Sequence, residues 1–175
     1  MAKRISSHWR RAGDELTEVL RKNLDRASHG KQPKWRWLPS ALTSVIDAHF
    51  QLGRIGREQG RPQEALDHFG EVISRDDKHS QSEIWREIGA TYQAVSMWED
   101  ARQALERFLE RRPFDAEGLY RMADVASKLN EPEKSREMLE RCVDAVKTMP
   151  YYRRGEVRKW GKLAQKGMQE LGSGI

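Results

Sequence analysis

The 175-residue sequence predicts an all-α protein in which pairs of helices stack along the chain. Apolar residues recur at steps of three and four positions, which places them on one face of a helix. One pattern of such residues returns after 36 positions and again after 34, and glycine and proline separate the periodic stretches. A unit of this length cannot bury its own apolar face, so about three units are expected to stack.

The clearest unit spans residues 80–115 and contains two helices. Its inner-face residues are, in order, Trp85, Ile88, Gly89, Tyr92, Ala101, Leu105 and Phe108, followed by Pro113. Small Gly89 and Ala101 let the two helix backbones approach, and the bulky side chains fill the space around that contact.

This order of residues resembles the tetratricopeptide (TPR) repeat, whose signature is a Trp, a Leu-Gly pair and a Tyr, then an Ala, an aromatic residue and a Pro. Less perfect copies lie on either side, where Leu52-Gly53 and Met122-Ala123 take the place of the Ile-Gly pair. The resemblance implies a right-handed α-solenoid of about three TPR helix pairs, with an extra N-terminal helix and a C-terminal capping helix.

The expected domain organisation follows from these repeats. Residues 1–38 hold a basic helix and a connector, residues 39–148 hold the three repeats, and residues 149–175 hold a basic capping helix. The repeats are expected near residues 46–79, 80–115 and 116–148.

Short local signals predict where the repeat helices begin. Pro62 suits the first turn of a helix, because its missing N–H has no intrahelical partner there. Ser80 with Glu83, and Ser96 with Glu99, have the spacing of capping boxes.

Charge is distributed unevenly along the chain. Residues 1–38 carry ten Lys or Arg against four Asp or Glu, a balance of +6. Residues 39–146 carry fifteen against twenty-one, a balance of −6, and residues 147–175 carry seven against two, a balance of +5. Basic ends beside an acidic body suggest that the ends meet an anionic surface or the acidic body of another copy.

The N-terminal part combines an amphipathic helix over residues 5–29 with an irregular connector, which interleaves tryptophan with cations at Trp35, Arg36 and Trp37. One interpretation is that these tryptophans fill the space between the first helix and the first repeat. The alternative is contact with a protein partner, lipid headgroups or single-stranded nucleic acid.

A second basic helix is expected over residues 151–171. Its apolar stripe suits the extra helix that closes many TPR arrays, and an anionic-surface helix is the alternative. Its candidate contact residues are Arg153, Arg154, Arg158 and Lys159.

The sequence shows no catalytic or metal-binding constellation. The five histidines form no closely spaced ligand pair, and no nucleotide loop or nucleophile–base pattern is present. The single cysteine, Cys142, falls at a core position and is expected to be a buried thiol. We therefore expect no enzyme activity, no cofactor, no metal and no small-molecule substrate.

In TPR proteins the first helix of each repeat lines a concave groove that binds peptides or partner helices. The resemblance places seven candidate contact residues in that groove: Phe50, Arg54, Arg57, Arg86, Gln93, Tyr120 and Asp124. For each of them, plain solvated helix surface is the alternative interpretation.

The resulting hypothesis is a non-catalytic protein–protein interaction scaffold, acting as a subunit or assembly factor of a larger complex through the groove and the basic ends. The alternative is an adaptor that binds nucleic acid or an anionic membrane through the basic termini. No apolar run reaches the roughly 18 residues of a membrane span, and no secretory signal begins the sequence. A cytoplasmic location is expected, with a place at the periphery of a membrane complex as the alternative.

Overall fold

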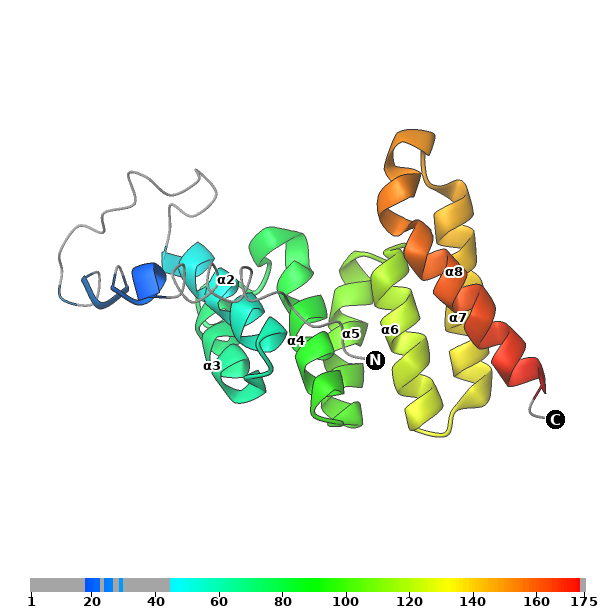
Figure 1. Cartoon of the computed structure of the whole chain (residues 1–175), viewed down its shortest axis with the longest axis horizontal. Coiled ribbons are helices and arrows are strands. Elements are labelled where there is room, and N and C mark those ends of the chain that lie inside the picture. Colours follow the sequence, from blue (N-terminus) through cyan, green and yellow to red (C-terminus); the bar gives the residue numbers. More distant parts are fainter. Residues whose placement is uncertain (1–17, 23, 27–28, 30–44, 174–175) are drawn as a thin grey trace. The chain divides into compact units, whose positions relative to one another are not determined.

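The computed structural model describes residues 18–22, 24–26, 29 and 45–173, and it is helical without a strand in this part of the chain. The chain divides into two compact units, residues 1–84 and 85–175. From Val45 on, the helices are α2 (Val45–Glu58), α3 (Pro62–Ile73), the 3-10 helix η2 (His79–Ser82), α4 (Glu83–Ala94), α5 (Trp98–Arg111), α6 (Ala116–Lys128), α7 (Pro132–Thr148) and α8 (Tyr151–Ser173) (Figure 1). This arrangement confirms the predicted all-α class.

The predicted N-terminal helix is described only over residues 18–22 and 24–26, which are helical. Within the first unit, Leu20 packs with Ala48 and Leu52 of α2 in a small buried cluster. Arg21 also forms an ion pair with Glu64 of α3. The connector with Trp35, Arg36 and Trp37 lies outside the described residues.

Helices α2 and α3 form a tight pair that crosses at a glycine. A Cβ added to Gly53 would stand 2.4 Å from Cε1 of Phe69, so the ring occupies the place of a side chain. The turn between the helices uses Gly60 at φ 73°, a conformation that glycine adopts without steric cost. Pro62 then occupies the first turn of α3, as the sequence predicts.

In the second unit, α4 and α5 cross at the predicted small pair. A Cβ on Gly89 would stand 2.7 Å from Cγ of Leu105 and 3.4 Å from the carbonyl oxygen of Ala101. The pair α6–α7 has Ala123 and Ser135 at the corresponding positions, and the buried Ser135 hydroxyl donates a hydrogen bond of 2.9 Å to the carbonyl oxygen of Ala123.

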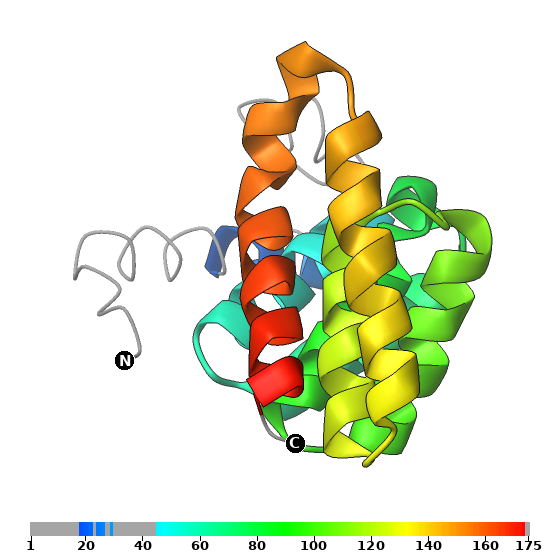
Figure 2. The same ribbon diagram turned by 90° about the vertical axis from the view of Figure 1, so that its right-hand side faces the viewer.

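Helix α8 closes the second unit. Figure 2 shows α7 and α8 side by side, and α8 also contacts α6. Ala164 of α8 is completely buried in the core that α5, α6 and α7 share. Of its predicted apolar stripe, Val157 and Trp160 pack against that core as well. Helices α4, α6 and α8 thus form one layer of this unit, and α5 and α7 form the other.

Two predicted capping boxes are wrong. Ser96 has φ 61° and precedes the N-cap of α5, which is Met97 and makes no side-chain capping bond. Ser80 lies inside η2 and not directly before α4, so it is not the N-cap of that helix. The one side-chain cap among the helices that the structure describes with a cap residue is Asp115, which accepts a hydrogen bond from the Gly118 amide at 2.8 Å.

Candidate functional site

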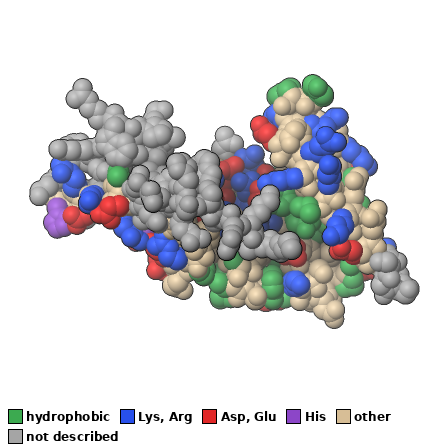
Figure 3. Space-filling model, viewed as in Figure 1, with side chains coloured by type: hydrophobic (Ala, Val, Ile, Leu, Met, Phe, Trp, Pro, Cys, Tyr) green, Lys and Arg blue, Asp and Glu red, His purple; other side chains and the backbone are tan. Residues whose placement is uncertain are grey.

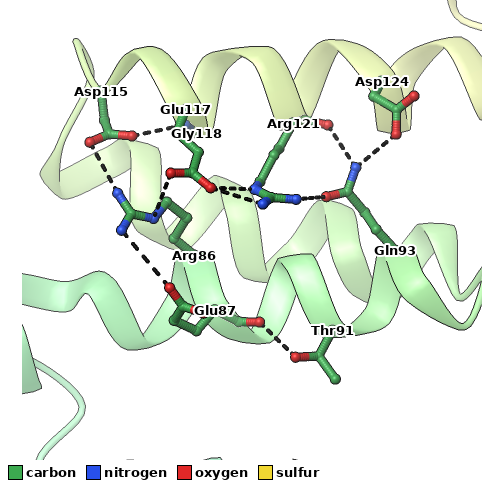
Figure 4. Close-up of polar contacts among 9 residues, drawn as sticks. All are labelled: Arg86, Glu87, Thr91, Gln93, Asp115, Glu117, Gly118, Arg121 and Asp124. Carbon is green, nitrogen blue, oxygen red and sulfur yellow. Dashed lines mark hydrogen bonds and ion pairs between the residues drawn. The ribbon is translucent and has the colours of Figure 1, made fainter. Parts of the chain in front are cut away.

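A continuous network of polar side chains joins α4 to α6 in the second unit (Figure 4). We call this network the polar ladder, and its members are Arg86, Gln93, Asp115, Glu117, Arg121 and Asp124. Arg86 and Gln93 lie seven positions apart on α4, and Glu117, Arg121 and Asp124 lie four and three positions apart on α6, so each set shares one helix face. Asp115 directly precedes α6. Three of the seven predicted groove residues, Arg86, Gln93 and Asp124, belong to it.

The ladder begins at Arg86. Its Nη1 donates to Asp115 at 3.4 Å, and its Nε lies 3.9 Å from a carboxylate oxygen of Glu117. The guanidinium also stands over the ring of Phe108, 5.5 Å from its centroid. Only 15% of the Arg86 side chain is exposed, so this cation sits among acceptors at the edge of the core. Asp115 thereby serves twice, as the cap of α6 and as the partner of α4.

The ladder continues through Arg121 and Gln93. Arg121 donates to Glu117 one turn earlier at 2.8 and 2.9 Å, and to the amide oxygen of Gln93 at 3.2 Å. Gln93 then donates to Asp124 at 2.9 Å and to the Arg121 carbonyl oxygen at 3.3 Å. Hydrogen-bond donors and acceptors alternate along this face. A partner with both donors and acceptors could therefore pair with it, and neither positive nor negative charge would be left in excess at the contact.

An aromatic pair lies where this face reaches α8. The rings of Tyr120 and Trp160 are 5.5 Å apart between centroids. Two cations flank the Trp160 ring, Arg121 at 5.6 Å and Lys159 at 4.5 Å. Burial, followed by the nearby carboxylate of Asp124, raises the pKa of the Tyr120 hydroxyl, which therefore stays protonated. Tyr120 is thus half-buried against α8.

The groove candidates of the first unit occupy a different environment. Phe50 is buried, 4% exposed, and packs edge-on against the ring of His79 at 5.1 Å. Arg54 lies over the same phenyl ring at 6.0 Å, and Asp47 pairs with His79 at 3.3 Å. Arg57 is half-buried in the last turn of α2, where a cation favours the helix dipole. Phe50 therefore anchors this face, and the cations border it.

The predicted basic contact residues of α8 lie at its beginning. Arg153, Arg154, Arg158 and Lys159 are all exposed. Arg154 also donates to two carbonyl oxygens at the end of α7, Lys147 at 3.1 Å and Met149 at 3.1 Å. It thereby links the two helices at their turn, whereas Arg153 and Arg158 are simply exposed.

The structure brings together one pair of histidines that the sequence does not indicate. His49 of α2 and His68 of α3 stand with their Nδ1 atoms 3.0 Å apart. One ring must donate and the other accept, so at least one imidazole is neutral. Burial and the neighbouring His68 ring lower the pKa of His49, and burial lowers that of His68 although Glu64 opposes it. Their separation of 19 positions hid the pair from a search for closely spaced ligands.

The described residues also include possible metal ligands and one thiol. No group of three or more His, Cys, Asp and Glu side chains suited to a metal ion occurs there. Cys142 is buried and donates to the Ala116 carbonyl oxygen at 3.2 Å, and burial raises its pKa to about 11. The thiol is therefore protonated at neutral pH. Within the part of the chain that the structure describes, no helix is both long and apolar enough to cross a membrane.

Comparison with known proteins identifies the repeats. Two sequence models, both described as tetratricopeptide repeat, match residues 46–79 and 88–150, which together make up more than half of the chain. A curated relative is the transcription factor tau 131 kDa subunit of Saccharomyces cerevisiae, 23% identical over 128 residues. That match covers 73% of this chain and only 12% of the yeast protein.

Two solved structures of MamA share the fold. One, of MamA AMB-1, has a TM-score of 0.54 at 12% identity and covers 92% of this chain and 86% of its own. The other has a TM-score of 0.55 at 17% identity and covers 92% and 96%. Since the repeat models match where the structure has its helix pairs, the chain belongs to the tetratricopeptide repeat family.

Proposed function

We propose that this chain is a non-catalytic protein-interaction scaffold, a subunit or assembly factor of a larger complex, and that a protein partner lies along the face that carries the polar ladder. The main support for this proposal is the polar ladder. It presents alternating donors and acceptors on the first helices of two successive repeats, the face that TPR proteins use to bind partners. The yeast relative is by name a subunit of a transcription factor, which supports a role inside an assembly.

The exposed fractions of the ladder suit a binding surface. The side chains of Arg86, Glu117 and Arg121 are between 15% and 23% exposed, so each keeps one edge toward solvent while its other contacts fix its rotamer. Preorganised side chains lose little conformational entropy when a partner binds. A partner segment that carries both carboxylate and amide groups would match the alternating donors and acceptors of the ladder.

The first experiment is affinity purification of the native protein from its own source at low and high salt, with mass spectrometry of the co-purifying proteins. We expect a defined set of proteins that survives high salt. Recovery of nucleic acid alone, lost at high salt, would contradict a protein scaffold, because phosphate contacts are strongly salt-dependent.

A second experiment locates the surface. Arg86→Ala and Tyr120→Ala should each weaken capture of the partner set, with thermal unfolding recorded because both residues also have internal contacts. Arg107→Ala is the matched control. Arg107 belongs to α5 in the other layer, is exposed, and stacks on Trp85 at 4.7 Å much as Arg86 stacks on Phe108. Equal loss of capture from the control would mean that the ladder is not the binding surface.

A further inference from the structure

The turn between α7 and α8 is the most exposed aromatic feature of the described residues. Tyr151 and Tyr152 begin α8, and they are 89% and 81% exposed. Met149 is extended, with φ −62° and ψ 135°, and Pro150 follows it, so α7 ends and α8 starts without a gradual bend. The two phenol rings consequently stand on the end of a helical hairpin.

This hairpin projects beyond the neighbouring turn of the same unit. Arg141 of α7 donates to the Pro113 carbonyl oxygen in the α5–α6 turn at 3.4 Å. Helix α7 continues from there to Thr148, a rise of about 10 Å at the usual rise per residue. In Figure 3, hydrophobic side chains cover the end of the projecting hairpin, and Lys and Arg side chains lie directly below them.

Cations follow the tyrosine pair along α8. The first three turns of α8 carry Arg153, Arg154, Arg158 and Lys159 against one acid, Glu156. Arg154 is turned onto the end of α7, and Lys159 lies on Trp160. Arg153 and Arg158 are exposed, and neither has an acidic partner within the part of the chain that the structure describes. We call Tyr151, Tyr152, Arg153 and Arg158 the hairpin tip.

We propose that the hairpin tip binds an anionic lipid surface, with the two tyrosines entering the headgroup region and the two arginines pairing with lipid phosphates or carboxylates. Tyrosine is favoured at such interfaces because its ring is apolar and its hydroxyl remains hydrated. Arginine next to a negatively charged leaflet is attracted to it. The tip combines both kinds of side chain on one convex end.

The shape of the tip favours a lipid surface over a peptide. Peptide sites are grooves with preformed walls, and two rings that are more than four-fifths exposed have no such wall. A bilayer is soft and flat, so a convex end can enter it without a complementary pocket. This inference goes beyond the protein scaffold proposed above and uses residues outside the polar ladder.

The test measures flotation of the whole chain with vesicles of phosphatidylcholine and phosphatidylserine in equal amounts, against vesicles of phosphatidylcholine alone. We expect binding to the anionic vesicles only, and weaker binding as salt screens the charges. Replacing Arg153→Glu and Arg158→Glu together should weaken binding about 30-fold or more. Tyr151→Ala with Tyr152→Ala should also weaken it about tenfold, even at unchanged net charge.

Two control variants make the result specific to the tip. Lys162→Glu with Lys166→Glu changes the net charge equally, but these exposed residues lie farther along α8. Phe114→Ala removes another aromatic side chain, 75% exposed, from the lower α5–α6 turn. Both controls should retain most of the binding. If the lysine variant lost as much vesicle binding as the arginine variant, the proposal for the hairpin tip would be wrong. The whole basic face of α8 would then be the binding surface.

Two further results would overturn the proposal. One is binding to neutral and anionic vesicles alike, because the arginines would then have no role. The other is salt-sensitive binding of a single-stranded oligonucleotide without vesicle binding, which would assign the tip to nucleic acid. Partner capture through the ladder should be unaffected by the tip variants, so failure of this proposal is distinguishable from failure of the scaffold.

Discussion

The α2–α3 and α4–α5 pairs cross at a glycine in the same position of the repeat, yet they fill the crossing differently. Gly53 faces the ring of Phe69, whereas Gly89 faces the branched side chain of Leu105. Both large side chains are completely buried. In both pairs a small residue stands opposite a large one, while the chemical type of the large residue differs.

The α6–α7 pair fills its helix crossing in a third way. It has Ala123 in place of the glycine, and Ser135 in place of the small alanine of the second pair, where the serine hydroxyl binds the carbonyl oxygen of Ala123. A side-chain hydrogen bond thus takes part in this crossing, whereas Phe69 and Leu105 contribute apolar side chains to the other two. Size is conserved along the repeats although polarity is not.

Removing the large partner should have the largest effect. Phe69→Ala should lower the free energy of unfolding by about 3–5 kcal/mol, and Leu105→Ala by about 2–5 kcal/mol, because each leaves a cavity beside a glycine that cannot fill it. Chemical denaturation would measure both losses. Phe114→Ala, at an exposed position, should change stability little. Losses below about 1 kcal/mol would show that the crossings collapse around the missing side chain.

Enlarging the glycine should have the next largest effect. Gly53→Ala and Gly89→Ala should each cost about 1–3 kcal/mol through overpacking, with the larger loss at Gly53, where a rigid ring stands in the way. Gly70→Ala in α3 is the control, since nothing lies within 4 Å of its added Cβ. It should instead stabilise the helix by about 0.5–1 kcal/mol. The same gain at Gly53 would contradict close packing there.

Replacing the polar contact of the third pair should cost less. Ser135→Ala removes one hydroxyl from a site that is 2% exposed, and the hydrogen bond to Ala123 is worth about 0.5–1.5 kcal/mol. It also recreates the small alanine of the second pair. If Ser135→Ala instead raised stability in denaturant melts, burial of the hydroxyl would cost more free energy than its hydrogen bond contributes.

The smallest expected effect is a dependence on acidic pH that comes from the histidine pair of the first unit. In the unfolded chain, a histidine takes up a proton as the pH falls below its usual pKa of 6.5. In the folded protein, His49 and His68 take up protons less readily, because folding lowers the pKa of both. Stability should therefore be fully present above that pH and fall as the pH drops through 6.5.

The measurement is thermal unfolding at a series of pH values. His49→Gln with His68→Gln keeps a pair of hydrogen-bonding side chains that do not titrate, and it should flatten the slope. His79→Gln is the control from the same unit. An unchanged slope in the double variant would assign the dependence to other groups.

The helical class, the repeat and the small residues at which helices cross can be predicted from the sequence. Those features are encoded by spacing within one helix or between two neighbouring helices, such as Leu52-Gly53 and Met122-Ala123 at the positions of Ile88-Gly89. The resemblance to the TPR repeat, rather than spacing alone, placed Arg86, Gln93 and Asp124 together as groove candidates, and their use by a partner stays a prediction.

Which of these side chains meet depends on how the helices pack in three dimensions. Arg86 and Asp115 lie 29 positions apart, and His49 and His68 lie 19 apart, so their contacts depend on how the helices cross. The same holds for the exposure of Tyr151 and Tyr152, which follows from the projection of α7 past the neighbouring turn. A local pattern fixes the face of a helix, but the distance between two faces is set by packing of the whole unit.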